Sequence, residues 1–307
     1  MRCKRLFIIG NGFDIYHGIK SRYADFRKYL ESVDPDVCHK LKEYFDYDNL
    51  WSDFELSLAA FEANRLVENA EDYLVSYGAE EWSDAYHHDY QNEISEVVHT
   101  LSYGLKTRFA SWIAQIKIPV SARKRLLNYV DDKAFFLTFN YTPTLQAVYG
   151  IDDENIFHIH GKVGNKVSEV VLGHAWNPID RLALRGNIGL EVLEAEDPRV
   201  TEGNQIIEKY FALTYKPTAE IIRNHRSFFK GLSSVEEIYI LGHSMLKADI
   251  EYFQHIVNSI DLEVVRWHAS YFGADELDRH KETIKKLGVR QNMVKFSYLE
   301  SLAGNLT

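Results

Sequence analysis

The sequence predicts an α/β fold built on a mostly parallel, doubly wound sheet with helices on both faces. Short apolar runs of the kind that form buried strands recur along the 307 residues. Stretches with the 3.6-residue period of amphipathic helices separate these runs. Two of the runs end directly in a glycine turn, at Gly10 and at Gly242, as strands do where a doubly wound sheet passes into a helix.

Six apolar runs are expected to form the strands. In chain order they are Leu6–Ile9, Ala134–Phe139, Ile156–Ile159, Glu237–Leu241, Leu262–Trp267 and Met293–Tyr298. Two helices are expected near the C-terminus. One is indicated by apolar residues on a single helical face, at Ile250, Phe253, Val257 and Ile260. The other covers Asp275–Leu287 and is followed by Gly288, the residue type that most often follows a helix C-terminus.

A long interval interrupts this alternation. From about Tyr23 to Asp132 the chain is aromatic, acidic and mostly helical in period, without a convincing strand. We therefore predict a nucleotide-binding sheet domain of residues 1–22 and 133–307, with a helical insertion at 23–132. A second irregular interval, about His174 to Gly231, contains Gly186, Gly189, Pro198, Gly203 and Pro217 and predicts loops plus a helix, with a lid as one interpretation.

Composition excludes several classes of protein. The chain is 46% hydrophobic and 13% aromatic, which excludes a disordered chain, and its net charge of −10 argues against a broad surface for duplex nucleic acid. Two cysteines cannot form a disulfide framework or a four-cysteine zinc site, so we expect a reducing, cytoplasmic location. No apolar run exceeds four residues, so no membrane association is expected.

The motif IIGNGFD, residues 8–14, is the first candidate for ligand binding. A strand that enters a glycine turn and then a helix presents backbone N–H groups where phosphate binds well, and a Cβ there would block a pyrophosphate. The candidate binding residues are Gly10, Asn11, Gly12, Phe13 and Asp14. Ile15 replaces the third glycine of the dehydrogenase fingerprint, and the charge of Asp14 would repel a phosphate. A tight structural turn is the alternative.

The motif TFNYTPTL, residues 138–145, follows the second expected strand. Thr142 and Pro143 have the types favoured at the N-cap and first position of a helix. That assignment places Asn140 at the carboxyl end of the strand, where open α/β sheets bind ligands. The alternative is that Asn140 only forms hydrogen bonds within the turn.

The motif FHIHG, residues 157–161, carries two histidines. In a strand, His158 and His160 would point to the same face, but two ligands do not make a metal site. A histidine at a strand end, beside a glycine that permits close approach, suits a general base. A packed or surface histidine is the alternative.

The motif LGHSMLKAD, residues 241–249, forms the second strand–glycine turn. It offers the hydroxyl of Ser244 and backbone N–H groups to a ligand, but it lacks the second glycine of a hydrolase nucleophile elbow. Asp249 opens a helix; we take it as a candidate ligand-binding residue, with helix capping as the alternative.

The motif WSDFE, residues 51–55, has the pattern of a helix start. Ser52 and Glu55 have the spacing of a capping box, and Trp51 and Leu56 have the spacing of its hydrophobic staple. Spacing alone gives Glu55 no catalytic role.

Taken in order, GNGFDIYHGIKSRYADF, WSDFE, FNYTPTL, IHG and LGHSMLKAD resemble the bacteriophage abortive-infection AbiH family over about Gly10 to Tyr252. That family is similar in turn to sirtuin-like NAD-binding proteins, so the resemblance implies a Rossmann-like sheet with a smaller helical module. It implies that Gly10 and Gly12 hold phosphates and that Gly242 and Ser244 hold the ADP-ribose half of a ligand. It also implies catalytic roles for Asn140 and His160.

Some features depart from the sirtuin pattern. Asp14 stands near the place of a small hydroxyl residue, Thr142 stands where related motifs often have Asp, and the zinc module is absent. These departures argue against protein deacetylation. The function implied is an antiphage abortive-infection effector that hydrolyses NAD, or a related nucleotide, at the ribosyl–nicotinamide bond.

Several expectations accompany this function. NAD or an ADP-ribose-like nucleotide would be the substrate or ligand, and no tightly bound cofactor or metal is expected. A phage-derived trigger and a homo-oligomer are possible partners. Two alternatives stay open: a nucleotide-sensing module of the same fold without turnover, and a nuclease in which Asp14, Glu55 and His160 hold a metal ion.

Overall fold

The computed structural model describes residues 4–80, 82–162, 164, 166–178 and 197–302. The chain divides into two compact units. The sheet unit comprises Met1–Arg22, Trp112–Val171 and Pro217–Thr307, and the helical unit comprises Tyr23–Ser111 and Leu172–Lys216. These boundaries differ from the predicted insertion at 23–132. Leu127 and Tyr129 are buried in the core of the sheet unit, and the helix of residues 198–213 packs along a helix of the helical unit.

The sheet has six strands, all parallel, in the order β3-β2-β1-β4-β5-β6. Their bounds are β1 Arg5–Ile9, β2 Phe135–Thr138, β3 Ile156–His158, β4 Glu237–Leu241, β5 Arg266–Ser270 and β6 Val294–Ser297. This is the strand order of a doubly wound Rossmann sheet. The predicted α/β class with a parallel sheet is therefore confirmed.

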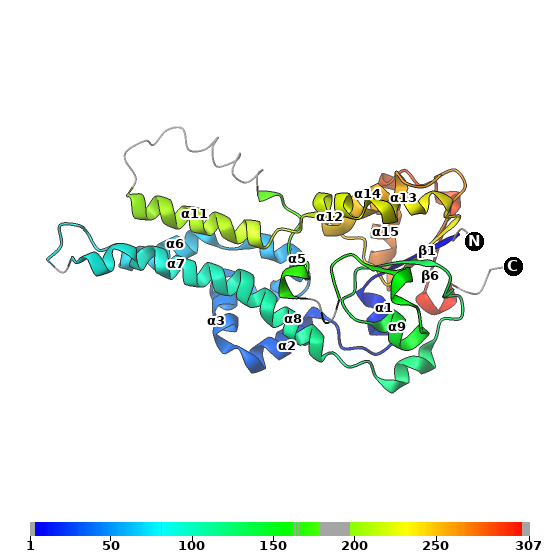
Figure 1. The fold of residues 1–307 in the computed structure, drawn as a ribbon, viewed down its shortest axis with the longest axis horizontal. Coiled ribbons are helices and arrows are strands. Elements are labelled where there is room, and N and C mark those ends of the chain that lie inside the picture. Colours follow the sequence, from blue (N-terminus) through cyan, green and yellow to red (C-terminus); the bar gives the residue numbers. More distant parts are fainter. Residues whose placement is uncertain (1–3, 81, 163, 165, 179–196, 303–307) are drawn as a thin grey trace. The chain divides into compact units, whose positions relative to one another are not determined.

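Helices cover both faces of the sheet (Figure 1). Alternate residues of β1 enter two separate cores, because successive side chains of a strand point to opposite faces. Phe7 and Ile9 pack with Phe13 and Leu145 of the first set of helices: α1 Asn11–Tyr16 and α9 Thr144–Tyr149. Leu6 and Ile8 belong to the core of the second set: α12 Thr218–Asn224, α13 Arg226–Gly231, α14 Ile250–Val257 and α15 Ala274–Lys286.

The fifth strand lies further along the chain than its predicted position, Leu262–Trp267. β5 begins at Arg266, because the residues before it form a turn. The side chain of Asp261 accepts the backbone N–H of Glu263, and its carbonyl accepts those of Val264 and Val265. An Asp that bonds to the backbone in this way favours a turn over a strand, although the residues that follow are apolar.

The helical unit contains most of the remaining helices. They are α2 Tyr23–Val33, α3 Pro35–Tyr44, α4 Tyr47–Leu50, α5 Phe54–Ser57, α6 Ala63–Ala70, α7 Asp89–His99, α8 Leu105–Gln115, up to Ser111, and α11 Pro198–Leu213. α7 and α11 lie side by side (Figure 1), and Gly203 of α11 fits against Tyr90 and Ile94 of α7. A π-helical segment, Thr100–Gly104, joins α7 to α8.

Two further expectations concern the lack of strands in the helical interval and the presence of a lid. The part of the helical unit that the structure describes contains no strand, only an isolated bridge between His174 and Tyr215. The interval His174 to Gly231, predicted to form loops plus a helix with a lid as one interpretation, contains α11, α12 and α13 in its described residues. Its residues 179–196 lie outside the described residues. Within the described ranges, no helix combines the length and the apolar character needed to cross a membrane.

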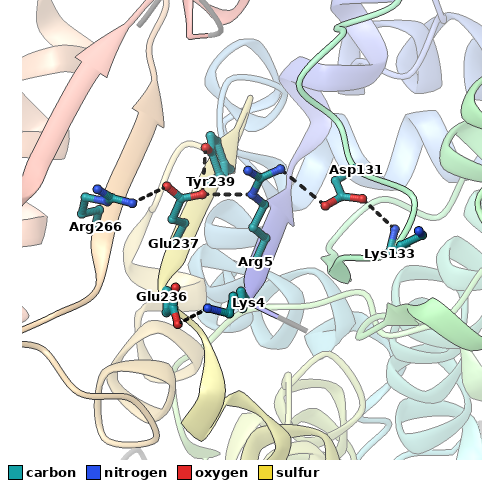
Figure 2. A network of polar contacts seen from close by, with 8 residues as sticks. All are labelled: Lys4, Arg5, Asp131, Lys133, Glu236, Glu237, Tyr239 and Arg266. Atoms are coloured by element: carbon teal, nitrogen blue, oxygen red, sulfur yellow. Dashed lines mark hydrogen bonds and ion pairs between the residues drawn. The ribbon is translucent and has the colours of Figure 1, made fainter. Parts of the chain in front are cut away.

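A charged network fixes the register of the central strands at their amino ends (Figure 2). Glu237 of β4 is buried, and its carboxylate accepts hydrogen bonds from Arg5 of β1 and Arg266 of β5, each at 2.9 Å. Arg5, Glu237 and Arg266 are also partners in the strand ladder. Beside them, Glu236 forms an exposed ion pair with Lys4 at 2.8 Å.

The substitution Glu237→Gln is expected to lower the free energy of unfolding by about 1–2 kcal/mol. The loss is smaller than for a fully buried pair because Arg5 and Arg266 are 35% and 65% exposed. Urea unfolding measures it. The matched control is Glu236→Gln, whose exposed ion pair should cost less than about 0.5 kcal/mol. Equal losses for the two neighbours would contradict the assignment.

Candidate functional site

The candidate site lies at the carboxyl edge of the sheet, between β1 and β4. The chain leaves β1 toward β2 on one side and leaves β4 toward β5 on the other, so the strand order reverses between these two neighbours. Doubly wound sheets bind their ligands outside the carboxyl ends of the strands at such a point. Gly10 follows β1 directly and Gly242 follows β4 directly, so both predicted glycine turns lie at this switch point.

The two glycine turns pack against each other. The N–H of Gly10 donates to Leu241 O at 3.0 Å, and the N–H of Gly12 donates to Gly242 O at 2.8 Å. A Cβ on Gly10 would lie 2.5 Å from the Cα of His243, and one on Gly12 would lie 2.8 Å from the Cα of Gly242. The close approach of the two turns therefore requires these glycines, in line with the structural turn that was the alternative to a pyrophosphate site.

The remaining residues of the first turn also have structural contacts. The N–H of Phe13 donates to Gly10 O at 3.0 Å, and the Phe13 side chain is fully buried in the core. The amide of Asn11 donates to Ser21 O at 3.0 Å and accepts the Ser21 hydroxyl at 2.5 Å. Asn11 therefore braces the loop that follows α1.

Asp14 and Asn140 belong to a buried polar cluster on the α1 and α9 side of the sheet. The Asp14 carboxylate accepts hydrogen bonds from the hydroxyls of Thr142 and Thr144, the latter at 2.6 Å. The Asn140 amide donates to Gly10 O at 3.1 Å. The predicted N-cap at Thr142 is wrong: α9 begins at Thr144 after Pro143, and the Thr142 hydroxyl binds Asp14 instead.

Burial raises the pKa of Asp14 from an ordinary 3.8 to about 6, against the opposing effect of hydrogen bonds from Thr142, Thr144 and Asn140. As the pH rises from about 4 to about 6, the unfolded chain ionises this group while the folded chain keeps the proton. The contribution of Asp14 to the free energy of unfolding therefore falls across that window.

The substitution Asp14→Asn is expected to remove this dependence. Relative to wild type, the variant should gain about 2–3 kcal/mol of stability between pH 4 and pH 7, because each pKa unit corresponds to about 1.4 kcal/mol. Urea unfolding at four pH values measures the difference. Asp278→Asn, at an exposed position, controls for the loss of one charge. A difference that stays flat or falls with pH would contradict the expected sign.

The two histidines of FHIHG point in different directions, contrary to the expectation that they share a face. β3 ends at His158, and Ile159 and His160 form a turn, so the alternation of a strand stops there. Nδ1 of His158 lies 3.1 Å from Asn140 O, and its Nε2 lies 3.0 Å from the Gln146 amide of α9. The ring of His160 instead packs against Phe139 and against Tyr252 of α14, with centroid distances of 5.2 and 5.7 Å.

His160 belongs to a second buried cluster, which contains Asp249 and His243. Oδ1 of Asp249 lies 3.8 Å from Nε2 of His160, and Oδ2 lies 3.5 Å from Nε2 of His243. The ring of Phe139 lies against both imidazoles, at 5.2 Å from His160 and 4.2 Å from His243. Asp249 stands at the N-cap of α14, but its side chain makes no cap hydrogen bond.

A model of the family described as "Bacteriophage abortive infection AbiH" matches residues 6–271. The chain belongs to the AbiH family. The match runs from β1 to the residue after β5 and includes both glycine turns and both polar clusters. No curated protein and no solved structure matches the chain. Membership of AbiH assigns the protein to phage abortive infection.

The AbiH motifs thus supply two groups of side chains at one edge of the sheet. Asn140 and Asp14 lie on the side of α1 and α9, and His160, His243 and Asp249 lie on the side of α14. The groups adjoin, because His160 contacts the rings of Phe139 and Tyr141, the residues on either side of Asn140. Ser244 is half-buried beside them, and the ring of His280 on α15 faces the backbone of His243 and Ser244.

His243 is the residue that sequence reasoning missed at this edge of the AbiH fold. The motif LGHSMLKAD drew attention to the hydroxyl of Ser244, as in serine hydrolases. The signal that could have found His243 is its place directly after the glycine of a strand turn, the position from which side chains reach the mouth of the sheet.

The WSDFE motif of AbiH does not form the predicted capping box. The Ser52 hydroxyl donates to Asn49 O at 2.7 Å, and Glu55 pairs with Lys216 at 2.5 Å and accepts the Tyr23 hydroxyl at 3.0 Å. Trp51 stacks on Phe54 rather than on Leu56, which is exposed. Across the described ranges, no three His, Cys, Asp or Glu side chains gather as metal ligands would.

Proposed function

We propose that this AbiH protein is an abortive-infection effector that binds an NAD-type dinucleotide at the carboxyl edge of its sheet and hydrolyses the ribosyl–nicotinamide bond. The observation that carries the proposal is the switch point between β1 and β4, in Rossmann strand order, with a histidine–carboxylate pair in the adjoining turns. Cleavage of NAD would starve an infected cell, which is the outcome that abortive infection requires.

The proposed reaction needs little covalent chemistry from the protein. Nicotinamide leaves as a neutral base and takes the electron pair of the C1′–N bond, so it needs no acid. Water attacks C1′ and loses a proton to His160, while Asn140 orients the ribose or the water. Catalysis therefore consists of positioning, charge stabilisation and general-base assistance.

The test is release of nicotinamide from NAD and NADP by the purified protein, followed by chromatography. His160→Ala and Asn140→Ala are each expected to lower the rate at least about 10²-fold, the lower end of general acid–base effects. His39→Gln, an exposed histidine of the helical unit, is the control and should leave the rate unchanged. If the wild-type protein releases no nicotinamide, with or without lysate of infected cells, NAD hydrolysis is not its function.

A second candidate function is nucleotide sensing without turnover. The observation that favours it is burial: Asn140 is 7% exposed and His160 is 2% exposed. Tight binding of ADP-ribose in calorimetry, without any product from NAD, would support sensing over hydrolysis. The same burial supports a requirement for a phage-derived trigger, which is why the hydrolysis assay includes infected-cell lysate.

A further inference from the structure

We propose that Asp249 and His243 are positioning residues for His160, and that they leave Nδ1 of His160 as the atom that accepts the proton of the attacking water. The inference rests on the proposed hydrolysis and deepens it. It assigns a role to His243 and gives Asp249 a positioning role in place of the ligand-binding role that the sequence predicts.

The first step is the sharing of one carboxylate by two imidazoles. The two oxygens of Asp249 face different rings, Oδ1 toward His160 at 3.8 Å and Oδ2 toward His243 at 3.5 Å. Both rings are 97% buried or more, and the Asp249 side chain is 15% exposed. A carboxylate in this position attracts an N–H, or a full positive charge, on each facing nitrogen.

The second step fixes the tautomer of His243. The backbone N–H of Met245 donates to its Nδ1 at 2.9 Å, so that nitrogen carries a lone pair. The ring proton of neutral His243 therefore lies on Nε2 and faces Asp249. Met245 holds its N–H there with φ at +48°, a left-handed conformation that a residue with a side chain rarely adopts. Such strain is often found at functional sites.

The third step concerns His160. Oδ2 of Asp249 faces Nε2 of His243, and Oδ1 faces Nε2 of His160, where the carboxylate favours an N–H. Neutral imidazole has a single N–H, so Nδ1 of His160 keeps the lone pair. During hydrolysis the water O–H bond breaks toward Nδ1, the O–C1′ bond forms and the C1′–N bond breaks. Asp249 then stabilises the imidazolium that results.

The environment of His160 makes the effect of Asp249 measurable. The rings of Phe139, Tyr141 and Tyr252 pack against it, and the described titratable groups that face it include Asp249 and the two tyrosines, with His243 on the other oxygen of Asp249. Behind His243 lies His280, whose Nε2 is 3.8 Å from Glu276.

Kinetics give the first test. Asp249→Asn is expected to lower kcat about 10²-fold or more with KM nearly unchanged, and to move the acid limb of the pH profile to lower pH. His243→Leu should lower kcat about 10-fold, and His243→Gln should restore part of it, because an amide N–H can replace the Nε2–H. Asp278→Asn is the control. Wild-type kcat and an unmoved pH profile in Asp249→Asn would overturn the inference.

Nitrogen NMR of ring-labelled protein gives a test that does not need turnover. His243 should show the Nε2–H tautomer, and the titration midpoint of His160 should fall in Asp249→Asn. If the wild type cleaves no NAD but the midpoint still falls, the proposed hydrolysis fails and the positioning relation holds. If the midpoint is unchanged, or His243 carries its proton on Nδ1, the relation is wrong whatever the activity.

Discussion

Gly242→Ala is expected to prevent the sheet unit from folding, or to lower its free energy of unfolding by more than about 4 kcal/mol. A Cβ at this position would lie 2.2 Å from the backbone nitrogen of Phe13 and 2.5 Å from the carbonyl carbon of Gly12. Both obstacles are backbone atoms of the turn after β1, so no side-chain rotation relieves them. The turns could separate only by losing the hydrogen bond from Gly12 N–H to Gly242 O.

Gly150→Ala is the matched control. Gly150 has φ of +69°, close to the +62° of Gly242, but in the described part of the chain no atom beyond its own chain neighbours lies within 4 Å of the position of its Cβ. Alanine there costs only the left-handed backbone strain, about 1–2 kcal/mol. Urea unfolding and near-UV circular dichroism of both variants separate strain from collision. A loss at Gly242 no larger than at Gly150 would show that the turns are free to move apart.

Three glycines stand at the switch point: Gly10, Gly12 and Gly242. Their first explanation, the approach of a pyrophosphate, came from the resemblance of the turn to nucleotide-binding loops. Contact between the β1 and β4 turns accounts for Gly10, Gly12 and Gly242 without any ligand. That contact was not predictable from sequence, because it depends on β4 being the neighbour of β1 although more than 220 residues separate the two strands.

The elements themselves were largely predictable. Buried parallel strands are continuous apolar runs, and this pattern located five of the strands, β1 to β4 and β6, while it placed the fifth too early in the chain. The error at β5 arose because Leu262 and Val265 are apolar yet belong to a turn that Asp261 stabilises. Hydrophobicity indicates that residues are buried, but it does not distinguish a strand from a turn. Here the hydrogen bonds of Asp261 distinguish the two.

The sequence motifs identified residues of the candidate site, but they did not predict which of these residues contact one another. Asn140 and His160 are candidates because each stands at a predicted strand end, and Asp249 is a candidate because it opens a helix within LGHSMLKAD. Their pairing depends on the direction in which each turn points its side chains. His158 is the last residue of β3, and His160 lies in the turn that follows, so the two side chains point in different directions. Asp249 and His160 belong to loops after β4 and β3, so their approach depends on the strand order.

The helical unit contains a buried ion pair between Glu55 and Lys216, although the spacing of WSDFE predicts a capping-box role for Glu55. Lys216, whose side chain is fully buried, donates to Glu55 at 2.5 Å, and Glu55 is 13% exposed. Tyr23 of α2 donates its hydroxyl to the other oxygen of the same carboxylate at 3.0 Å. The segment of Lys216 is held in turn by the backbone of His174, whose carbonyl accepts the Lys216 N–H at 2.8 Å. Glu55 therefore joins three segments distant in sequence.

Glu55→Gln is expected to lower the free energy of unfolding by about 3–5 kcal/mol, because it removes the carboxylate charge that pairs with a buried ammonium. In Lys216→Met, where that charge is already gone, the same substitution should cost much less. The double-mutant cycle measures the coupling by urea unfolding. The exposed pair of Glu62 and Arg65, about half exposed on each side, is the control, and Glu62→Gln should cost under about 1 kcal/mol.

The stability of the double variant relative to wild type decides what the pair does in this fold. Burying two charges costs desolvation that their attraction only partly offsets, so the double variant is expected to approach wild-type stability. A pair that added net stability would instead leave the double variant clearly less stable than wild type. Near-wild-type stability of the double variant would mean that Glu55 and Lys216 determine how α2, α5 and the segment after α11 pack together. The pair would then contribute little to the free energy of unfolding.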